Sequence, residues 1–274
     1  MNYYHNIDKL FVIFYNIFNF GGIVMNFDTF DELGLWLKCY ENYKFTDSTS
    51  QGECYKIGNK VYKIFIQFLE EEYCDFIEYD KDSILQFSSI KNKTYIWPID
   101  TIMVGDIVVG YVTNYVNAKS LYKINPLLVN LDKFENALKN VISDIKVISD
   151  NGILTFDVTY NILYGRYGLK VIDSMEYSRT NMDSLELYRV NKERFNYEIR
   201  LFLIDGYFDD FINDNPLLYG MCYDSSVDFI SFLREFRREL SQKEGHEILK
   251  LGEAKKSLVI HKSRNPKYIR NLCM

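Results

Sequence analysis

Several residue types are scarce in this chain of 274 residues, and each scarcity excludes a class of site. The five cysteines are odd in number and widely spaced, so neither a disulfide framework nor a zinc site is expected, and a reducing cytoplasm fits best. The three histidines lie near the two ends of the chain, which leaves a histidine-based catalytic triad without support. The four prolines stand singly and mark turns rather than linkers.

The charge balance also excludes a class of partner. There are 32 Lys and Arg residues against 38 Asp and Glu residues, a net charge of −6. Binding to nucleic acid in general requires clustered basic residues that neutralise phosphates, so no specific nucleic-acid partner is expected. Residues 246–274 are basic and could seek an acidic partner, but a solvated end that balances an acidic body is the favoured interpretation.

The first 24 residues include an apolar segment that differs from the rest of the chain. The apolar run Leu10–Phe20 is shorter than the roughly 20 residues of a membrane span, and it lacks the cleavage site of a signal peptide. The run from Gly21 to Met25 is what a ribosome-binding site before a start codon would encode. We therefore predict that residues 1–24 are a misassigned leader, that translation begins at Met25, and that the protein has no membrane partner. Membrane association through residues 10–20 is the alternative.

Residues 25–116 are predicted to form a small β-rich lobe with one helix. Two β-rich runs, 54–57 and 60–65, are joined by Gly58-Asn59, which is a typical hairpin link. A short helix is predicted at 83–87. Two further strands are predicted at 95–97 and 107–112.

Residues 117–274 are predicted to form a mostly helical lobe, which makes the fold class α+β. Apolar residues recur at steps of three and four from Leu131 to Ile148, with Asn130 placed to cap that helix. Similar spacing predicts helices at 193–203 and 229–240. Between the helix at 131–148 and the helix at 193–203, Gly165–Gly168 is predicted to be the turn of a small β-hairpin.

Four polar residues occur in an order that suits phosphoryl transfer. Lys63 ends the first hairpin, Asp157 and Asn161 precede the second, and Asp173 follows it. Phosphoryl transfer from ATP requires a lysine on the phosphates, oxygen ligands for Mg²⁺ and a carboxylate that orients the attacking hydroxyl. ATP and Mg²⁺ are therefore the expected cofactors.

On these residues, positions 45–180 resemble the protein-kinase-like fold, in a divergent, bacterial-type form. The resemblance implies two lobes, in which Lys63 would hold the phosphates and Thr113–Val116 would form the hinge. Backbone groups of Asn114 and Val116 would bind adenine. Asp157 would be the catalytic aspartate, and Asn161 and Asp173 would hold the metal ion. The resemblance implies a cytoplasmic phosphotransferase whose acceptor is a hydroxyl of a protein or of a small molecule.

The sequence departs from the kinase pattern at several points. Asp157 precedes Asn161 by four positions, where the family has five, and the candidate phosphate-covering loop 47–53 contains one glycine, Gly52. Glu78 and Asp82 are both candidates for the acidic partner of Lys63. These departures leave two alternatives open: a non-catalytic, kinase-like interaction module, or an unrelated α+β protein.

Overall fold

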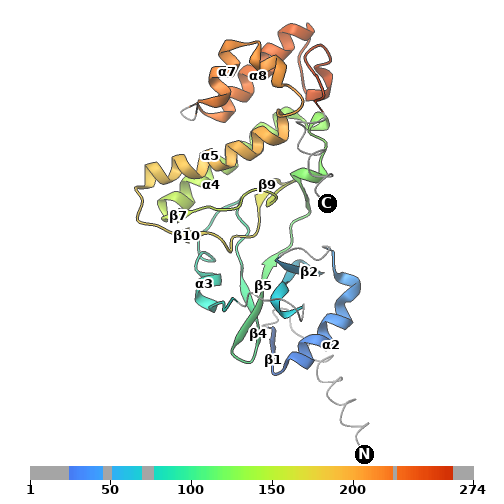
Figure 1. Ribbon diagram of the computed structural model, residues 1–274, viewed down its shortest axis with the longest axis vertical. Helices are drawn as coiled ribbons and strands as arrows, with labels where there is room; N and C mark the ends of the chain where they lie inside the picture. The colour runs from blue at the N-terminus through green and yellow to red at the C-terminus, as the bar shows by residue number, and fades with distance from the viewer. Residues whose placement is uncertain (1–24, 46–50, 70–76, 225–226, 262–274) are drawn as a thin grey trace, which may run out of the picture. The chain divides into compact units, whose positions relative to one another are not determined.

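The computed structural model describes residues 25–45, 51–69, 77–224 and 227–261, which form two compact units (Figure 1). The first unit contains the described residues up to Ser88 together with Pro98–Tyr115. The second contains Ser89–Trp97 and the described residues from Val116 onward. The predicted leader, residues 1–24, and positions 47–50 of the predicted phosphate loop lie outside the described residues.

The first unit is built on a five-stranded sheet with the strand order β1-β4-β5-β3-β2. Its strands are β1 (Met25–Phe27), β2 (Gly52–Ile57), β3 (Lys60–Phe65), β4 (Asp100–Val104) and β5 (Ile107–Asn114). Strand β1 runs parallel to β4, and the other neighbours are antiparallel. The predicted Gly58-Asn59 hairpin is confirmed, and Gly58 has the positive φ of +60° that such a turn favours.

Two helices accompany this sheet. Helix α2 (Phe30–Tyr40) begins at Thr29, whose side chain accepts a hydrogen bond from the Glu32 N–H. Leu33 and Trp36 of α2 are buried in the apolar core that the sheet provides. Helix α3 (Lys81–Leu85) lies close to the short helix predicted at 83–87. Helix α2 and strands β1 and β4 were not predicted from the sequence.

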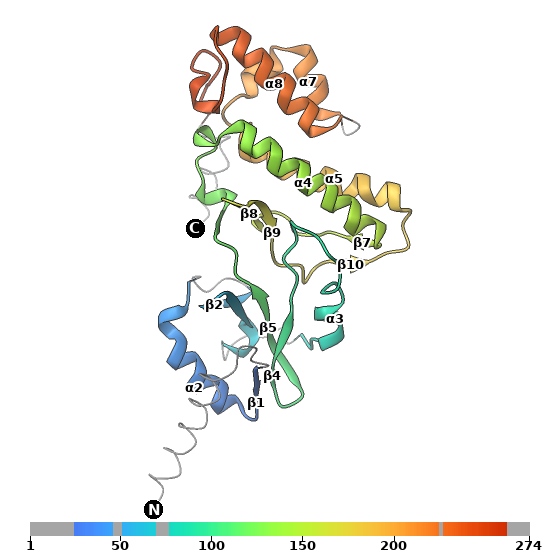
Figure 2. The same cartoon turned by 180° about the vertical axis from the view of Figure 1, so that it is seen from behind.

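The second unit is mostly helical. Helices α4 (Leu131–Asp150) and α5 (Ser184–Leu203) lie side by side in both views (Figures 1 and 2). They are followed by α6 (Asp209–Asn213), α7 (Pro216–Tyr223) and α8 (Phe229–Glu244). Asn130 caps α4 as predicted, because its side chain accepts a hydrogen bond from the Lys133 N–H at 2.9 Å.

Two small sheets complete the second unit. One has the order β6-β8-β9 and consists of β6 (Ala118–Ser120), β8 (Ile162–Gly165) and β9 (Gly168–Val171). The other pairs β7 (Ile153–Leu154) with β10 (Ser178–Arg179). The hairpin predicted around Gly165–Gly168 is confirmed, because β8 and β9 are antiparallel and their last pair is Gly165 with Gly168. The predicted α+β class, with a β-sheet first and helices after it, is confirmed.

Residues 95–97 correct the sequence analysis. They do not form a strand: Tyr95 makes one isolated parallel bridge to Val171, and Pro98 follows Trp97. This segment belongs to the second unit, although the sequence analysis placed all of 25–116 in the first lobe. The buried Asp144 of α4 gives the reason, because its Oδ2 accepts hydrogen bonds from the Lys93 N–H at 3.0 Å and from the Thr94 hydroxyl at 2.6 Å.

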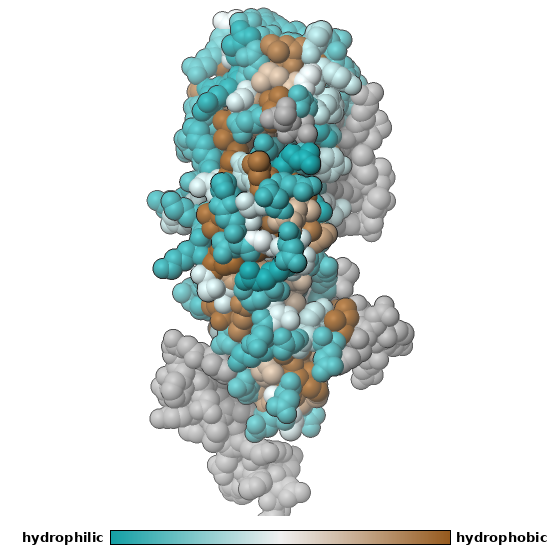
Figure 3. Space-filling view, turned by 90° about the vertical axis from the view of Figure 1, so that its left-hand side faces the viewer, coloured by the Kyte–Doolittle hydropathy of each residue, from teal (hydrophilic) through white to brown (hydrophobic). Residues whose placement is uncertain are grey.

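Hydrophilic side chains cover much of the molecular face drawn in Figure 3, with apolar ones scattered among them. Among the described residues, none of the helices has the length and apolar character needed to cross a bilayer.

Candidate functional site

The β8–β9 hairpin brings the two predicted metal ligands together. At its open end Ile162 pairs with Val171, and one step further out the Ile172 N–H donates to the Asn161 carbonyl at 3.0 Å. Asn161 immediately precedes β8, and Asp173 lies two residues beyond β9. Antiparallel pairing therefore places Asn161 and Asp173 at the same end of one hairpin.

The backbone is unusual at these same positions. Among the described residues, Asp157, Tyr160 and Asp173 are the non-glycine residues with positive φ, at 41°, 69° and 61°. Such conformations cost about 1–3 kcal/mol each and persist where the surrounding structure fixes them, most often at functional sites. All three lie in the two segments that the sequence analysis selected for catalysis and metal binding.

The short loop from Asp157 to Asn161 is closed by a side chain. Asn161 Nδ2 donates to the backbone carbonyl of Asp157 at 2.7 Å, across the four-position spacing. This bond fixes the carboxamide with its nitrogen turned toward the loop, so Oδ1 is left as an acceptor. The loop therefore has a defined conformation although it is one residue shorter than the kinase pattern.

The residues at the end of the hairpin fit a magnesium ion. The Asp173 carboxylate and the Asn161 carboxamide oxygen are hard oxygen ligands, and Mg²⁺ characteristically takes one or two such groups and fills its other positions with water and phosphate oxygens. No cluster of three His, Cys, Asp or Glu side chains suited to a metal occurs within the described parts of the chain. A metal ion held by these two ligands alone would take its other ligands from water or from a bound molecule.

Tyr177 is a buried tyrosine whose pKa is affected by both predicted aspartates, Asp157 and Asp173. Its side chain is buried, and its hydroxyl has no hydrogen-bond partner. Burial chiefly, and then the nearby carboxylates of Asp173 and Asp157, raise the pKa of this phenol. Both carboxylates are thus near enough to this phenol to contribute to its raised pKa. The aromatic ring of Tyr177 packs edge-on against Tyr95 and Trp97, with centroids 6.3 and 6.2 Å away.

Helix α5 holds the segment that leads into Asp157. The buried Asn191 accepts hydrogen bonds from the backbone N–H and the hydroxyl of Thr155, at 2.9 and 3.0 Å. Its amide nitrogen donates to Ser149 Oγ at 3.0 Å and to the Ile153 carbonyl at 2.8 Å. One turn further on, Arg194 donates to the Thr155 carbonyl. Residues 153–155, which lie just before Asp157 in the chain, are therefore hydrogen-bonded to α5.

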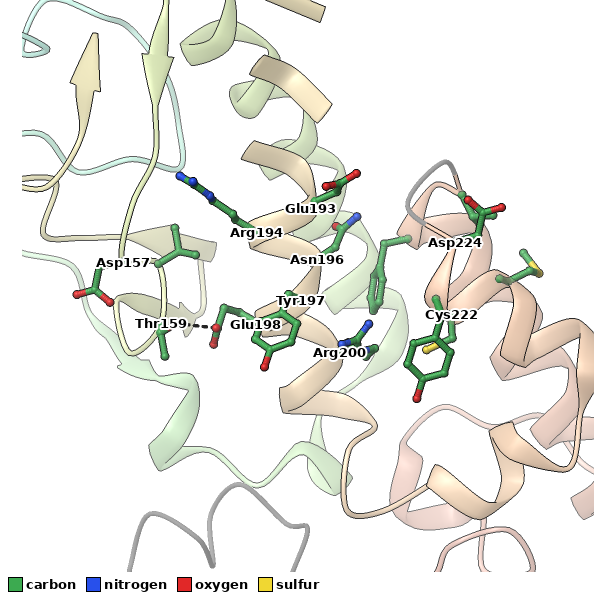
Figure 4. Close-up of a pocket in the computed structure, with 15 residues that line it drawn as sticks. Asp157, Thr159, Glu193, Arg194, Asn196, Tyr197, Glu198, Arg200, Cys222 and Asp224 are labelled. Atoms are coloured by element: carbon green, nitrogen blue, oxygen red, sulfur yellow. Dashed lines mark hydrogen bonds between the residues drawn. The ribbon is translucent and has the colours of Figure 1, made fainter. Parts of the chain in front are cut away.

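Glu198 of α5 holds the loop on the other side of Asp157. One carboxylate oxygen accepts from the Thr159 hydroxyl at 2.7 Å (Figure 4). The other accepts from the Tyr122 hydroxyl at 3.0 Å. Sequence reasoning missed both Asn191 and Glu198. A signal was present, because they are polar residues at inward positions of the same helical face that carries Phe195 and Phe202.

Replacing Glu198 with glutamine should make stability less dependent on pH. Burial, opposed by the Thr159 hydrogen bond and reinforced by Asp157, raises the pKa of Glu198 in the folded protein. At Glu198 the folded state therefore binds more protons than the unfolded state just above the ordinary glutamate pKa, so the contribution of this residue to stability falls as pH rises through that window. Urea unfolding of both proteins at pH 4 and pH 7 should show the glutamine variant gaining on wild type at the higher pH. A constant difference would contradict the raised pKa.

In the first unit, Lys63 and Gly52 lie on neighbouring strands. Lys63 is 7% exposed, and its Nζ donates to Gln51 Oε1 at 3.1 Å. Gly52 has a φ of 142°, and a Cβ there would lie 2.0 Å from the Ile64 carbonyl oxygen. The close approach of β2 to β3 therefore requires glycine whether or not a phosphate binds. Glu78 and Asp82, the two candidate partners of Lys63, are both exposed.

The predicted adenine-binding residues lie where β5 ends. Asn114 pairs with Lys60 across the sheet, and its side chain accepts from Lys60 Nζ at 2.9 Å. Val116 follows two residues later, and its carbonyl accepts from the Ala118 N–H at 2.9 Å. Asn114 belongs to the first unit and Val116 to the second. Adenine binding by these residues stays a prediction.

Comparison with known proteins adds one observation about fold. No protein-family model matches the chain, and no curated protein is similar to it. Among solved structures, it is similar to the kinase PK-1 of Cydia pomonella granulovirus, with a TM-score of 0.36 and 15% sequence identity. The match covers 56% of this chain and 61% of the viral kinase, which is less than two thirds of that protein. A likeness this low carries no argument about function, which rests on the geometry of the site.

Proposed function

We propose that the protein is a phosphotransferase of the protein-kinase-like superfamily that uses ATP and Mg²⁺ and acts on a hydroxyl group. The observation that carries this proposal is that unusual positive φ angles occur at the same residues whose side chains suit catalysis and metal binding. Asp157 and Asp173 both have positive φ values, and the carboxylates of both raise the pKa of Tyr177. Asn161 donates to the backbone carbonyl of Asp157 and lies at the same hairpin end as Asp173.

The residues have separate roles in this proposal. Lys63 positions the phosphates of ATP, with Gly52 beside them, and Asn114 and Val116 bind adenine. Asn161 and Asp173 hold Mg²⁺, which neutralises charge on the phosphates. The acceptor oxygen forms a bond to the γ-phosphorus while the bond from that phosphorus to the bridging oxygen of ADP breaks. ADP leaves with the electron pair, and the hydroxyl proton of the acceptor passes to Asp157.

A nucleotide assay on the full chain tests the proposal. With ATP and Mg²⁺ together, we expect a rise in melting temperature and release or transfer of the γ-phosphate, and EDTA should abolish the turnover. The shortened loop between Asp157 and Asn161 favours a second candidate, the non-catalytic kinase-like module. Stabilisation by ATP without any turnover would support that module. If ATP neither binds nor is turned over, both candidate functions are wrong.

A further inference from the structure

The hydroxyl of Tyr177 is a polar group for which the described residues provide no partner. The side chain is 3% exposed, and the hydroxyl makes no hydrogen bond. Burying a hydroxyl without a hydrogen bond costs free energy, because the bonds that it makes to water in the unfolded chain are lost. Few buried polar groups in native proteins are left in this condition, and one that lies beside candidate functional residues needs an explanation.

The backbone holds Tyr177 close to Asp173. Tyr177 is the fourth residue after Asp173, and its N–H donates to the Ser174 carbonyl at 3.1 Å, which closes a turn directly after Asp173. Ser174 and Tyr177 are both buried, so the two ends of this turn are packed in the protein interior. The turn therefore limits how far the phenol can lie from the Asp173 carboxylate.

The aromatic ring of Tyr177 is held by a segment that pairs with the strand leading to Asp173. The ring packs edge-on against Tyr95 and Trp97, which stack on one another with centroids 5.3 Å apart. Tyr95 makes its parallel bridge to Val171, the last residue of β9, and Val171 lies two residues before Asp173. The ring contacts and the turn therefore fix the phenol and Asp173 through the same end of one hairpin.

Asp173 is the acceptor that suits this donor best. A carboxylate accepts a charge-assisted hydrogen bond, which is roughly twice as strong as a bond between neutral groups. Of the two carboxylates that raise the pKa of Tyr177, Asp173 has the larger effect and Asp157 the smaller, which agrees with the placement that the turn and the ring contacts give. Carboxylates that bind metal ions are characteristically hydrogen-bonded to neighbouring groups, which orient them for the metal.

We propose that Tyr177 is a positioning residue for Asp173. Its hydroxyl donates to one carboxylate oxygen of Asp173, and this bond orients the other oxygen for Mg²⁺. The bond forms when Asp173 holds the ion, so the cost of burying the hydroxyl is offset in the metal-bound protein and remains in the metal-free protein. The inference rests on the metal role of Asp173 in the proposed function, and it adds a residue to those already assigned to the site.

The variant Tyr177→Phe, which removes only the hydroxyl, tests this role in the full chain. Mn²⁺ is the probe, because electron paramagnetic resonance detects it directly and oxygen ligands suit it as they suit Mg²⁺. With ADP present, we expect the dissociation constant of protein-bound Mn²⁺ to rise about tenfold in the variant, the lower end of the effect usual for groups that support a metal ligand. In EDTA the variant should melt at the wild-type temperature or above it, because it lacks the unpaired buried hydroxyl.

Tyr167→Phe is the matched control. It removes the same group from an exposed tyrosine in the turn at the opposite end of the β8–β9 hairpin, and it should change neither the Mn²⁺ affinity nor the melting temperature.

The other outcomes separate this inference from the proposed function. Equal Mn²⁺ affinity in wild type and Tyr177→Phe, or an equal loss in both tyrosine variants, would overturn the positioning role and leave the metal role of Asp173 in place. A lower melting temperature of Tyr177→Phe in EDTA would show that the hydroxyl has a structural partner, and would overturn the positioning role as well. Absence of Mn²⁺ binding in wild type would overturn the metal role of Asp173, and both proposals with it.

Discussion

Replacing Asp173 with asparagine should lower phosphotransfer turnover by about 10²–10³-fold, the size of effect seen when one preorganised electrostatic group is removed from an active site. The carboxylate carries the negative charge expected to hold Mg²⁺, and a neutral carboxamide does not. Asparagine is also the replacement that suits the backbone, since Asp173 has a φ of 61° and asparagine tolerates this left-handed region better than alanine does. The free energy of unfolding should therefore change by about 1 kcal/mol or less.

Steady-state turnover over a range of Mg²⁺ concentrations, together with urea unfolding, separates lost chemistry from lost folding. Glu176→Gln is the matched control, because it removes the same charge at an exposed position three residues further on. Turnover close to wild type in Asp173→Asn would contradict the metal role. An equal fall in both variants would mean that net charge in this segment, rather than a ligand at Asp173, governs the rate.

Local signals in the sequence predicted several elements correctly. The cap at Asn130, the hairpin at Gly58-Asn59 and the buried stripe through Phe195 and Ile199 are all set by residues close together in the chain. Strand β1 carries no comparable signal. It is three residues long, and its pairing with β4 joins Met25 to Ile102, a partner far away in the sequence.

The residues of the candidate site could be proposed from the sequence, but the side chains that support its loop could not. Asp157, Asn161 and Asp173 could be selected because their spacing around a hairpin suits a known chemistry. The positive φ values at Asp157 and Asp173 could not be foreseen, because residues other than glycine adopt this conformation only uncommonly. The segment 95–97 was misassigned for a related reason: its β-rich composition is local, but the hydrogen bonds that place its neighbours come from Asp144 in a distant helix.

The hydrogen bonds that Asn191 of α5 makes to residues 149–155 should contribute strongly to stability. Replacing the buried Asn191 with leucine, which has the same branching but bulkier methyl groups, should lower the free energy of unfolding by about 3–5 kcal/mol. The substitution leaves the N–H and hydroxyl of Thr155, the Ser149 hydroxyl and the Ile153 carbonyl without the bonds that Asn191 makes. Each buried polar group that loses its partner costs about 1–3 kcal/mol, so several together outweigh the added apolar contact of leucine.

Urea unfolding followed by circular dichroism measures this loss, with Asn140→Leu as the control at an exposed position of α4. The control should stay within about 0.5 kcal/mol of wild type, as exposed substitutions usually do. Because a typical domain is stable by only about 5–15 kcal/mol, the Asn191 variant should also populate open forms in which residues 153–155 leave α5. Hydrogen exchange at the Thr155 amide should then accelerate more than exchange in the centre of α4. Uniform acceleration would show that Asn191 supports the whole unit rather than the segment before Asp157.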